Sequence, residues 1–76
     1  MLIQVCGTGC AKCKELEKLV REVVEDVKSP ATVEHVTDIQ QIARLGVFTT
    51  PALVVDGVVK FAGGIPAKKD IAAWIA

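Results

Sequence analysis

Three cysteines stand within eight positions near the start of the chain: Cys6, Cys10 and Cys13. Cysteines serve as disulfide partners, metal ligands or nucleophiles, and their spacing helps to separate these uses. Cys10 and Cys13 form a C-x-x-C pair, and two cysteines at this spacing on a first helical turn lie close enough for an unstrained disulfide. The pair therefore predicts reversible dithiol–disulfide chemistry, with metal binding as the alternative.

The two cysteines of the pair are expected to play different parts. Cys13 begins an apolar periodicity that continues through Leu16 and Val20, so its thiol should point into the core. Cys10 precedes this face and should be exposed at the helix start, where unpaired N–H groups and the helix dipole favour a thiolate. Lys12 adds a positive charge, and both effects lower the pKa of a cysteine. Cys10 is thus the expected nucleophile, and Cys13 is the expected resolving thiol.

Metal binding fits the same residues less well. A closed zinc site needs about four ligands, usually as two such pairs, and Cys6 and His35 are the only further candidates. The C-x3-C-x2-C spacing also matches iron–sulfur sites in radical enzymes that use S-adenosylmethionine, but those enzymes need a much larger barrel than 76 residues can build. We therefore expect no metal and no cofactor other than the redox-active Cys10–Cys13 disulfide.

The remaining two candidates have simpler interpretations. Cys6 is expected to be a small buried hydrophobic residue at a strand end, with a third redox thiol that exchanges with Cys10 as the alternative. Because Cys6 could exchange with Cys10 and Lys12 places a positive charge near it, both residues are candidates for modulating the reactivity of the cysteine pair. His35 stands alone in a predicted strand, and we expect it to be a surface or packed residue.

The elements that position these residues can be read from periodicity and turn signals. An apolar run over 2–5 predicts a strand that enters a loop, and the face from Cys13 to Val27 predicts a helix that ends at Ser29-Pro30. A second strand is expected over 32–36. A second helix is expected over 38–45, with Asp38 as its N-cap, Gly46 after its end, and Ile39, Ile42 and Ala43 on its buried face.

The last third of the chain predicts a hairpin and a helix. Strands over 52–55 and 58–62 flank Asp56-Gly57, the strongest short hairpin signal. Gly63-Gly64 ends the second strand, and Pro66 suits the start of a third helix, with Ile71, Ala72, Trp74 and Ile75 packed inward. The fold class is therefore α/β, with the order βαβαββα and a four-stranded mixed sheet carrying three helices.

The Thr50-Pro51 pair precedes the predicted hairpin. A proline before a strand ordinarily marks a turn. In this order of elements, a cis Pro51 would also turn the backbone of Thr50 toward the cysteines, with groups available to pair with an extended peptide.

Taken together, these motifs resemble the thioredoxin-like superfamily, and within it the short thioredoxin-like or glutaredoxin-like proteins called redox-active disulfide proteins. The resemblance covers essentially the whole chain through C-x-x-C, Thr50-Pro51, the segment Ala-Leu-Val-Val-Asp-Gly and Gly63-Gly64. It implies that Cys10 attacks, Cys13 resolves, and Pro51 is a cis proline lining a substrate groove. It also implies that Gly63 and Gly64 let glutathione approach the backbone, as in glutaredoxins.

The chain also departs from that pattern at identifiable positions. Thioredoxins carry a buried acid about six residues before the first cysteine, and Gln4 stands there. Gly9 replaces the tryptophan before the motif, and Ala11-Lys12 replaces Gly-Pro within it.

The charge composition limits the kinds of molecule that the protein is expected to bind. Nine basic and nine acidic residues give a formal net charge of zero, so nucleic acids and membrane surfaces are not expected. No signal peptide or spanning segment is visible, which places the protein in the cytoplasm. We expect one domain over 1–76, a monomer, that exchanges electrons with protein disulfides and takes them from a reductase or glutathione. The alternatives are a metal-chaperone module, whose order would be βαββαβ, and a redox sensor without turnover.

Overall fold

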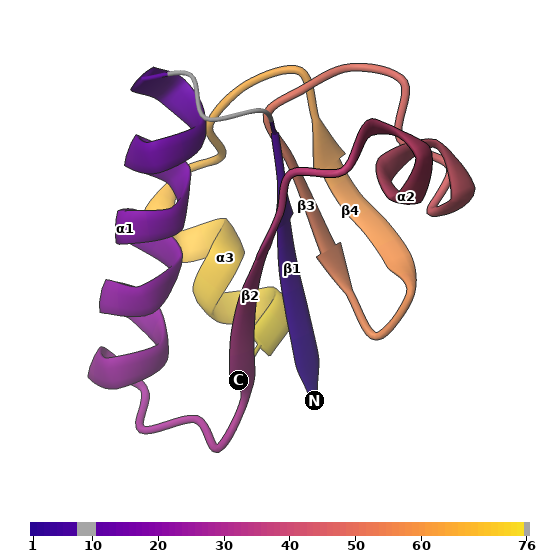
Figure 1. Ribbon diagram of the computed structural model, residues 1–76. Coiled ribbons are helices and arrows are strands. Elements are labelled where there is room, and N and C mark those ends of the chain that lie inside the picture. The colour runs from indigo at the N-terminus through magenta and orange to yellow at the C-terminus, as the bar shows by residue number, and fades with distance from the viewer. Residues whose placement is uncertain (8–10, 76) are drawn as a thin grey trace.

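The computed structural model describes residues 1–7 and 11–75 and has the predicted βαβαββα order (Figure 1). The strands are β1 (Leu2–Cys6), β2 (Thr32–Val36), β3 (Ala52–Val55) and β4 (Val58–Ala62). The helices are α1 (Ala11–Asp26), α2 (Ile39–Arg44) and α3 (Lys68–Ile75). Because α2 comes before the β3-β4 hairpin, the chain does not have the βαββαβ order of a metal-chaperone module.

The strands form one mixed sheet in the order β2-β1-β3-β4. β1 runs parallel to β2 and antiparallel to β3, so it lies in the middle of the sheet with partners on both sides. β3 and β4 form the predicted antiparallel hairpin. Asp56 and Gly57 both have positive φ, +49° and +82°, which is the backbone of the type I′ turn that an Asp-Gly pair favours.

The sheet carries a core on each face. α1 and α3 cover one face, and α2 lies on the other (Figure 1). The larger core contains Ile3, Val5, Leu16, Val20, Val23, Leu53, Val55, Ile71 and Ile75. The smaller core contains Cys6, Val36, Ile42, Val47, Ala52 and Val54. Because successive strand residues face opposite sides, β1 supplies Val5 to the first core and Cys6 to the second.

The long helix follows its predicted pattern closely. Its buried residues are Cys13, Leu16, Val20 and Val23, so a single apolar stripe holds α1 against the sheet. On the outer face, Arg21 Nε lies 3.0 Å from Glu17 Oε2, which forms an i,i+4 ion pair along the helix. Val27 falls past the end of the helix and is exposed, contrary to its predicted place on the buried face.

The prediction for the second helix is partly wrong. Asp38 is the N-cap and accepts a hydrogen bond from the Gln40 N–H at 2.9 Å. However, α2 has only six residues and buries only Ile42, while Ile39 is 70% exposed and Ala43 is exposed as well. A helix of under two turns presents one position, and not a full face, to the smaller core.

The third helix begins later than predicted. The N–H groups of Asp70 and Ile71 donate to the Ala67 carbonyl, so the helix starts at Lys68 and the buried Pro66 precedes it. Lys68 Nζ lies 2.9 Å from Asp26 Oδ2 and 3.2 Å from Glu22 Oε1, which ties the start of α3 to the end of α1. Within residues 1–7 and 11–75, no helix has the length and apolarity needed to cross a membrane.

Candidate active site

Cys13, the predicted resolving cysteine, is buried at the start of α1, as its position on the apolar face predicts. Cys13 lies in the first turn of α1 and has no solvent exposure. Lys12 is exposed on the same turn. Cys10, the predicted nucleophile, lies outside the described residues. The described half of the pair is therefore a buried thiol at the start of the helix that the larger core holds in place.

Gly7 forms a wall of the Cys13 thiol. A β-carbon added at Gly7 would overlap Cys13 Sγ and would lie 2.9 Å from Cys13 Cβ. No side chain fits at such a distance, so only glycine lets the end of β1 come this close to the helix start. The Gly7 N–H donates to the carbonyl of Val36, the last residue of β2, at 3.0 Å, which continues the pairing with β2 one residue beyond the end of β1.

The Thr50-Pro51 segment meets the same place from the other half of the chain. The Thr50 β-carbon lies 4.0 Å from the position that a Gly7 β-carbon would take. The peptide bond between Thr50 and Pro51 is cis, with Thr50 exposed and Pro51 buried. The Gly63 N–H donates to the Pro51 carbonyl at 2.9 Å. The structure therefore brings four residues that the sequence singled out close to one another: Cys13, Thr50, Pro51 and Gly63. They lie around Gly7, which the sequence did not single out.

Gly64 has a different neighbour. A β-carbon at this position would lie 3.5 Å from the Phe61 ring, which is an ordinary contact. The Phe61 ring in turn packs against Trp74 of α3, with ring centroids 6.4 Å apart. Gly64 thus lies at the β4–α3 connection, beside an aromatic pair.

Cys6 lies in the smaller core and is fully buried, as predicted for a hydrophobic role. Burial raises the pKa of the Cys6 thiol, and the negative charge of Glu34 raises this pKa further. Glu34 is also the partner of Gln4, whose Nε2 donates to Glu34 Oε1 at 3.5 Å. At the position where thioredoxins carry a buried acid, this chain therefore has the buried amide of Gln4 on β1, and its carboxylate partner lies on the neighbouring strand.

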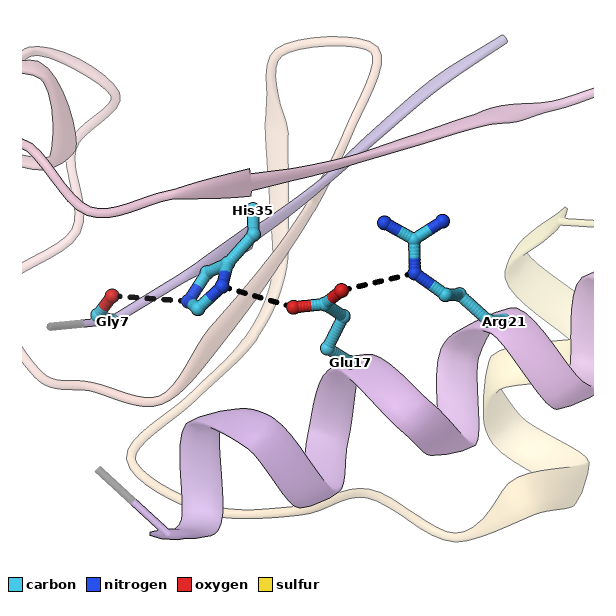
Figure 2. A network of polar contacts seen from close by, with 4 residues as sticks. All are labelled: Gly7, Glu17, Arg21 and His35. Atoms are coloured by element: carbon cyan, nitrogen blue, oxygen red, sulfur yellow. Dashed lines mark hydrogen bonds and ion pairs between the residues drawn. The ribbon is translucent and has the colours of Figure 1, made fainter. Parts of the chain in front are cut away.

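His35 is a feature that the sequence did not reveal. Its Nδ1 lies 2.9 Å from Glu17 Oε1 on α1, and its Nε2 lies 3.2 Å from the Gly7 carbonyl oxygen (Figure 2). The imidazole therefore links Gly7, the residue after β1, to α1, the helix that carries Cys13. No local pattern announces this role, because Gly7 is 28 residues away in the sequence.

An apolar groove begins at Thr50 and continues toward α2. Its volume is about 380 Å³, and it is lined by Ile39, Ile42, Ala43, Val47, Phe48 and Thr50. Phe48 is 89% exposed and Ile39 is 70% exposed. Large apolar side chains that lie this open beside a reactive centre favour contact with a partner.

The described residues contain no group of three or more His, Cys, Asp or Glu side chains that could hold a metal ion; Cys10 is not among these residues. What the geometry does present is a buried helix-start thiol, a bare glycine against it and a cis proline beside them. On a βαβαββα scaffold, this combination defines the class of thioredoxin-like dithiol proteins.

Comparison with known proteins agrees with this class. A family model for the thioredoxin domain matches residues 1–76. A thioredoxin from Methanothermobacter thermautotrophicus is 41% identical over 71 residues, which cover 93% of this chain and 92% of the relative. A thioredoxin from Methanocaldococcus jannaschii is 38% identical over 71 residues, covering 93% of this chain and 81% of that relative. The chain therefore belongs to the thioredoxin domain family and is a thiol–disulfide oxidoreductase.

The close approach at Gly7 predicts a specific intolerance. We expect Gly7→Ala to lower the free energy of unfolding by about 2 kcal/mol, because the new methyl group overlaps Cys13 and forces the helix start away. Urea denaturation of the reduced protein measures this. Gly64→Ala is the matched control, since its methyl group meets the Phe61 ring at an ordinary distance. Equal denaturation midpoints for the two variants would contradict the assigned contact.

The burial of Cys6 predicts low reactivity. We expect iodoacetamide to leave Cys6 unmodified in the folded protein near neutral pH, since burial and then the Glu34 charge raise the pKa of its thiol and deplete the thiolate. Mass spectrometry of the alkylated peptides measures this, and the same reaction in urea is the control. Alkylation of Cys6 at the same rate in the folded and unfolded protein would show that the thiol is accessible.

Proposed function

We propose that this protein reduces disulfide bonds of other proteins through its Cys10–Cys13 pair. The observation that carries the proposal is the convergence of Gly7 and Thr50-Pro51 on the buried Cys13 thiol. A thiol held in this way is kept from solvent yet stands beside backbone that an extended substrate can reach. Such a site suits a second, releasing step better than a first encounter with substrate.

The proposed reaction has two exchanges. The Cys10 thiolate attacks one sulfur of the substrate disulfide, so that a mixed disulfide forms and the other substrate sulfur leaves and takes up a proton. Cys13 then loses its proton and attacks the Cys10 sulfur, which releases the second substrate thiol. The substrate gains two electrons, and the Cys10–Cys13 pair becomes a disulfide.

Substrate binding is proposed for the exposed side of the same site. Thr50, ahead of the cis Pro51, would offer backbone groups to an extended segment on either side of the substrate disulfide. The groove from Thr50 to Phe48 and Ile39 would accept an apolar side chain of that segment. Its open aromatic ring supports a polypeptide substrate over a small, strongly charged one.

The supply of electrons and the location are also part of the proposal. A reductase or glutathione would return the Cys10–Cys13 disulfide to the dithiol, and the backbone at Gly63 and Gly64 is where glutathione would approach. Gly63 supports this by its hydrogen bond to Pro51, which keeps its backbone at the site. We assign the protein to the cytoplasm, where a dithiol is kept reduced. Lys12 would favour the Cys10 thiolate by its charge.

The division of labour between the cysteines predicts two different failures. Cys10→Ser should abolish the reduction of a protein disulfide such as insulin, because no attacking thiolate remains. Cys13→Ser should still attack but should accumulate a mixed disulfide through Cys10, since no second thiol can release it. Mass spectrometry under non-reducing conditions separates these results. An adduct in Cys10→Ser and none in Cys13→Ser would reverse the roles, and a parent protein without exchange would refute the function.

The groove predicts a selective loss. We expect Phe48→Ser to raise KM for a protein disulfide about tenfold, with kcat and the rate toward the small disulfide 5,5′-dithiobis(2-nitrobenzoate) unchanged, because burying an aromatic side chain contributes about 1.5 kcal/mol or more. Val58→Ser is the control, since Val58 is an exposed apolar residue of β4 outside the groove. Equal effects of the two substitutions would exclude the groove as a binding surface.

A further inference from the structure

The contacts of His35 carry an inference beyond the exchange reaction. His35 lies on β2, an edge strand of the sheet, and its side chain is about a quarter exposed. Its two ring nitrogens face two different elements: Glu17 on α1 and Gly7 at the end of β1 (Figure 2). Both partners offer only oxygen atoms to the ring.

Two acceptors determine how many protons the ring must hold. The Gly7 carbonyl can only accept a hydrogen bond. Glu17 uses Oε2 to pair with Arg21 at 3.0 Å, and its other oxygen, Oε1, faces His35, so both of its oxygens act as acceptors. A neutral imidazole has one N–H and one lone pair, and the lone pair would face an oxygen. Both contacts form together only when the ring is an imidazolium.

Loss of one proton would release a particular contact. A hydrogen bond to a carboxylate is stronger than one to a neutral carbonyl, so the remaining N–H would stay at Nδ1 with Glu17. The Nε2 lone pair would then face the Gly7 oxygen and repel it. The ion pairs of the described residues connect His35 to Glu17 and, through Glu17, to Arg21, both from α1. The end of β1 contributes the uncharged Gly7 carbonyl.

Gly7 is the residue through which this contact reaches the thiols. Its N–H donates to Val36 and its carbonyl oxygen contacts His35, so β2 holds both of its backbone polar groups. Its α-carbon stands against the Cys13 thiol with no room for a methyl group. A shift of Gly7 therefore moves the wall of the Cys13 thiol.

We propose that His35 is a positioning residue for the dithiol centre. In its doubly protonated form it bridges Glu17 and Gly7 and holds Gly7 against Cys13, and when it loses a proton it releases Gly7 and slows the resolving step. This role rests on the proposed function, since it concerns the exchange by the same two cysteines. It makes the site tighter on the acidic side of the range in which histidine changes charge, about pH 5 to 8.

The protonation can be tested without any activity assay. His35 is the single histidine of the chain, so 15N-labelled histidine gives one pair of ring signals. We expect both nitrogens to show the imidazolium shift whenever the contact with Gly7 is intact, and the Gly7 amide and carbonyl signals to move together with the ring signals when the pH is raised. A ring that is neutral throughout, or Gly7 signals that do not follow it, would overturn the proposal.

Kinetic variants test the positioning role. His35→Lys supplies several donors and keeps its charge, so it should hold Gly7 at every pH in this range. We expect the ratio of the parent exchange rate to the His35→Lys rate to fall roughly three- to fivefold between about pH 5 and 8, the factor that one hydrogen bond contributes. His35→Leu should be slow at low pH and should approach the parent as pH rises.

A substitution at Glu17 separates hydrogen bonding from charge. In Glu17→Gln, the amide can donate to a neutral Nδ1 while the Nε2–H of His35 still donates to Gly7. The exchange rate of Glu17→Gln divided by that of His35→Lys should therefore stay constant with pH. Glu22→Gln is the matched control, because it removes a carboxylate and an ion pair with Lys68 from the same helix and should leave the ratio as in the parent. If the exchange rates of Glu17→Gln and Glu22→Gln, each divided by the His35→Lys rate, fall equally with pH, the pH dependence comes from charge alone and the proposal is overturned.

The two proposals fail in different ways. If no variant and no parent protein exchanges disulfides, the proposed function is wrong, while the histidine and Gly7 signals still decide the contact. If the parent exchanges disulfides and His35→Lys, His35→Leu and the parent share one pH profile, the positioning role is wrong and the function stands.

Discussion

The site depends on one close approach, between the α-carbon of Gly7 and the thiol of Cys13. This approach fixes the start of α1 against the end of β1, and it requires that nothing larger than a hydrogen atom stand between them. The other supports follow from it. The apolar stripe of α1 holds the thiol side through Leu16 and Val20. β2 holds the glycine side through the Val36 carbonyl and the His35 side chain, which contact the two backbone polar groups of Gly7. A thioredoxin-type centre is therefore built here as much by backbone as by side chains.

The two cores support different parts of the site. The larger core, between the sheet and α1 and α3, fixes the helix that carries Cys13. The smaller core, under α2, contains Cys6 and holds the sheet in the region where β1 and β3 lead into the site. Since Cys6 faces away from α1, its thiol is separated from the Cys13 side by the sheet itself. The third cysteine is accordingly a packing residue of a different layer, although it lies close to the pair in the sequence.

Local patterns predicted the elements and the burial of Cys13, because strand alternation, helix periodicity and turn chemistry act over a few residues. Three of the four strands have the predicted bounds, and β1 extends one residue further, to Cys6. The same patterns were wrong for Ile39, because they could not show that α2 is too short to bury a second position. They also missed His35, whose partners come from β1 and α1 and depend on the register of β1 with β2. Contacts of this kind exist only once the sheet has formed.

The residues of the site come from two separate parts of the chain. Gly7, Cys13 and His35 belong to the first β-α-β unit, whereas Thr50, Pro51 and Gly63 belong to the hairpin unit that follows α2. The two units are joined in the sheet by the pairing of β1 with β3, whose contacts are distant in sequence. Closing such a long loop costs entropy that nearby contacts do not require. The surroundings of Cys13 are thus completed only by the tertiary fold, because a partly assembled chain has the thiol and Gly7 but lacks the Thr50-Pro51 segment beside them. The environment of the Cys13 thiol is in this sense a reporter of whether the two units have folded together.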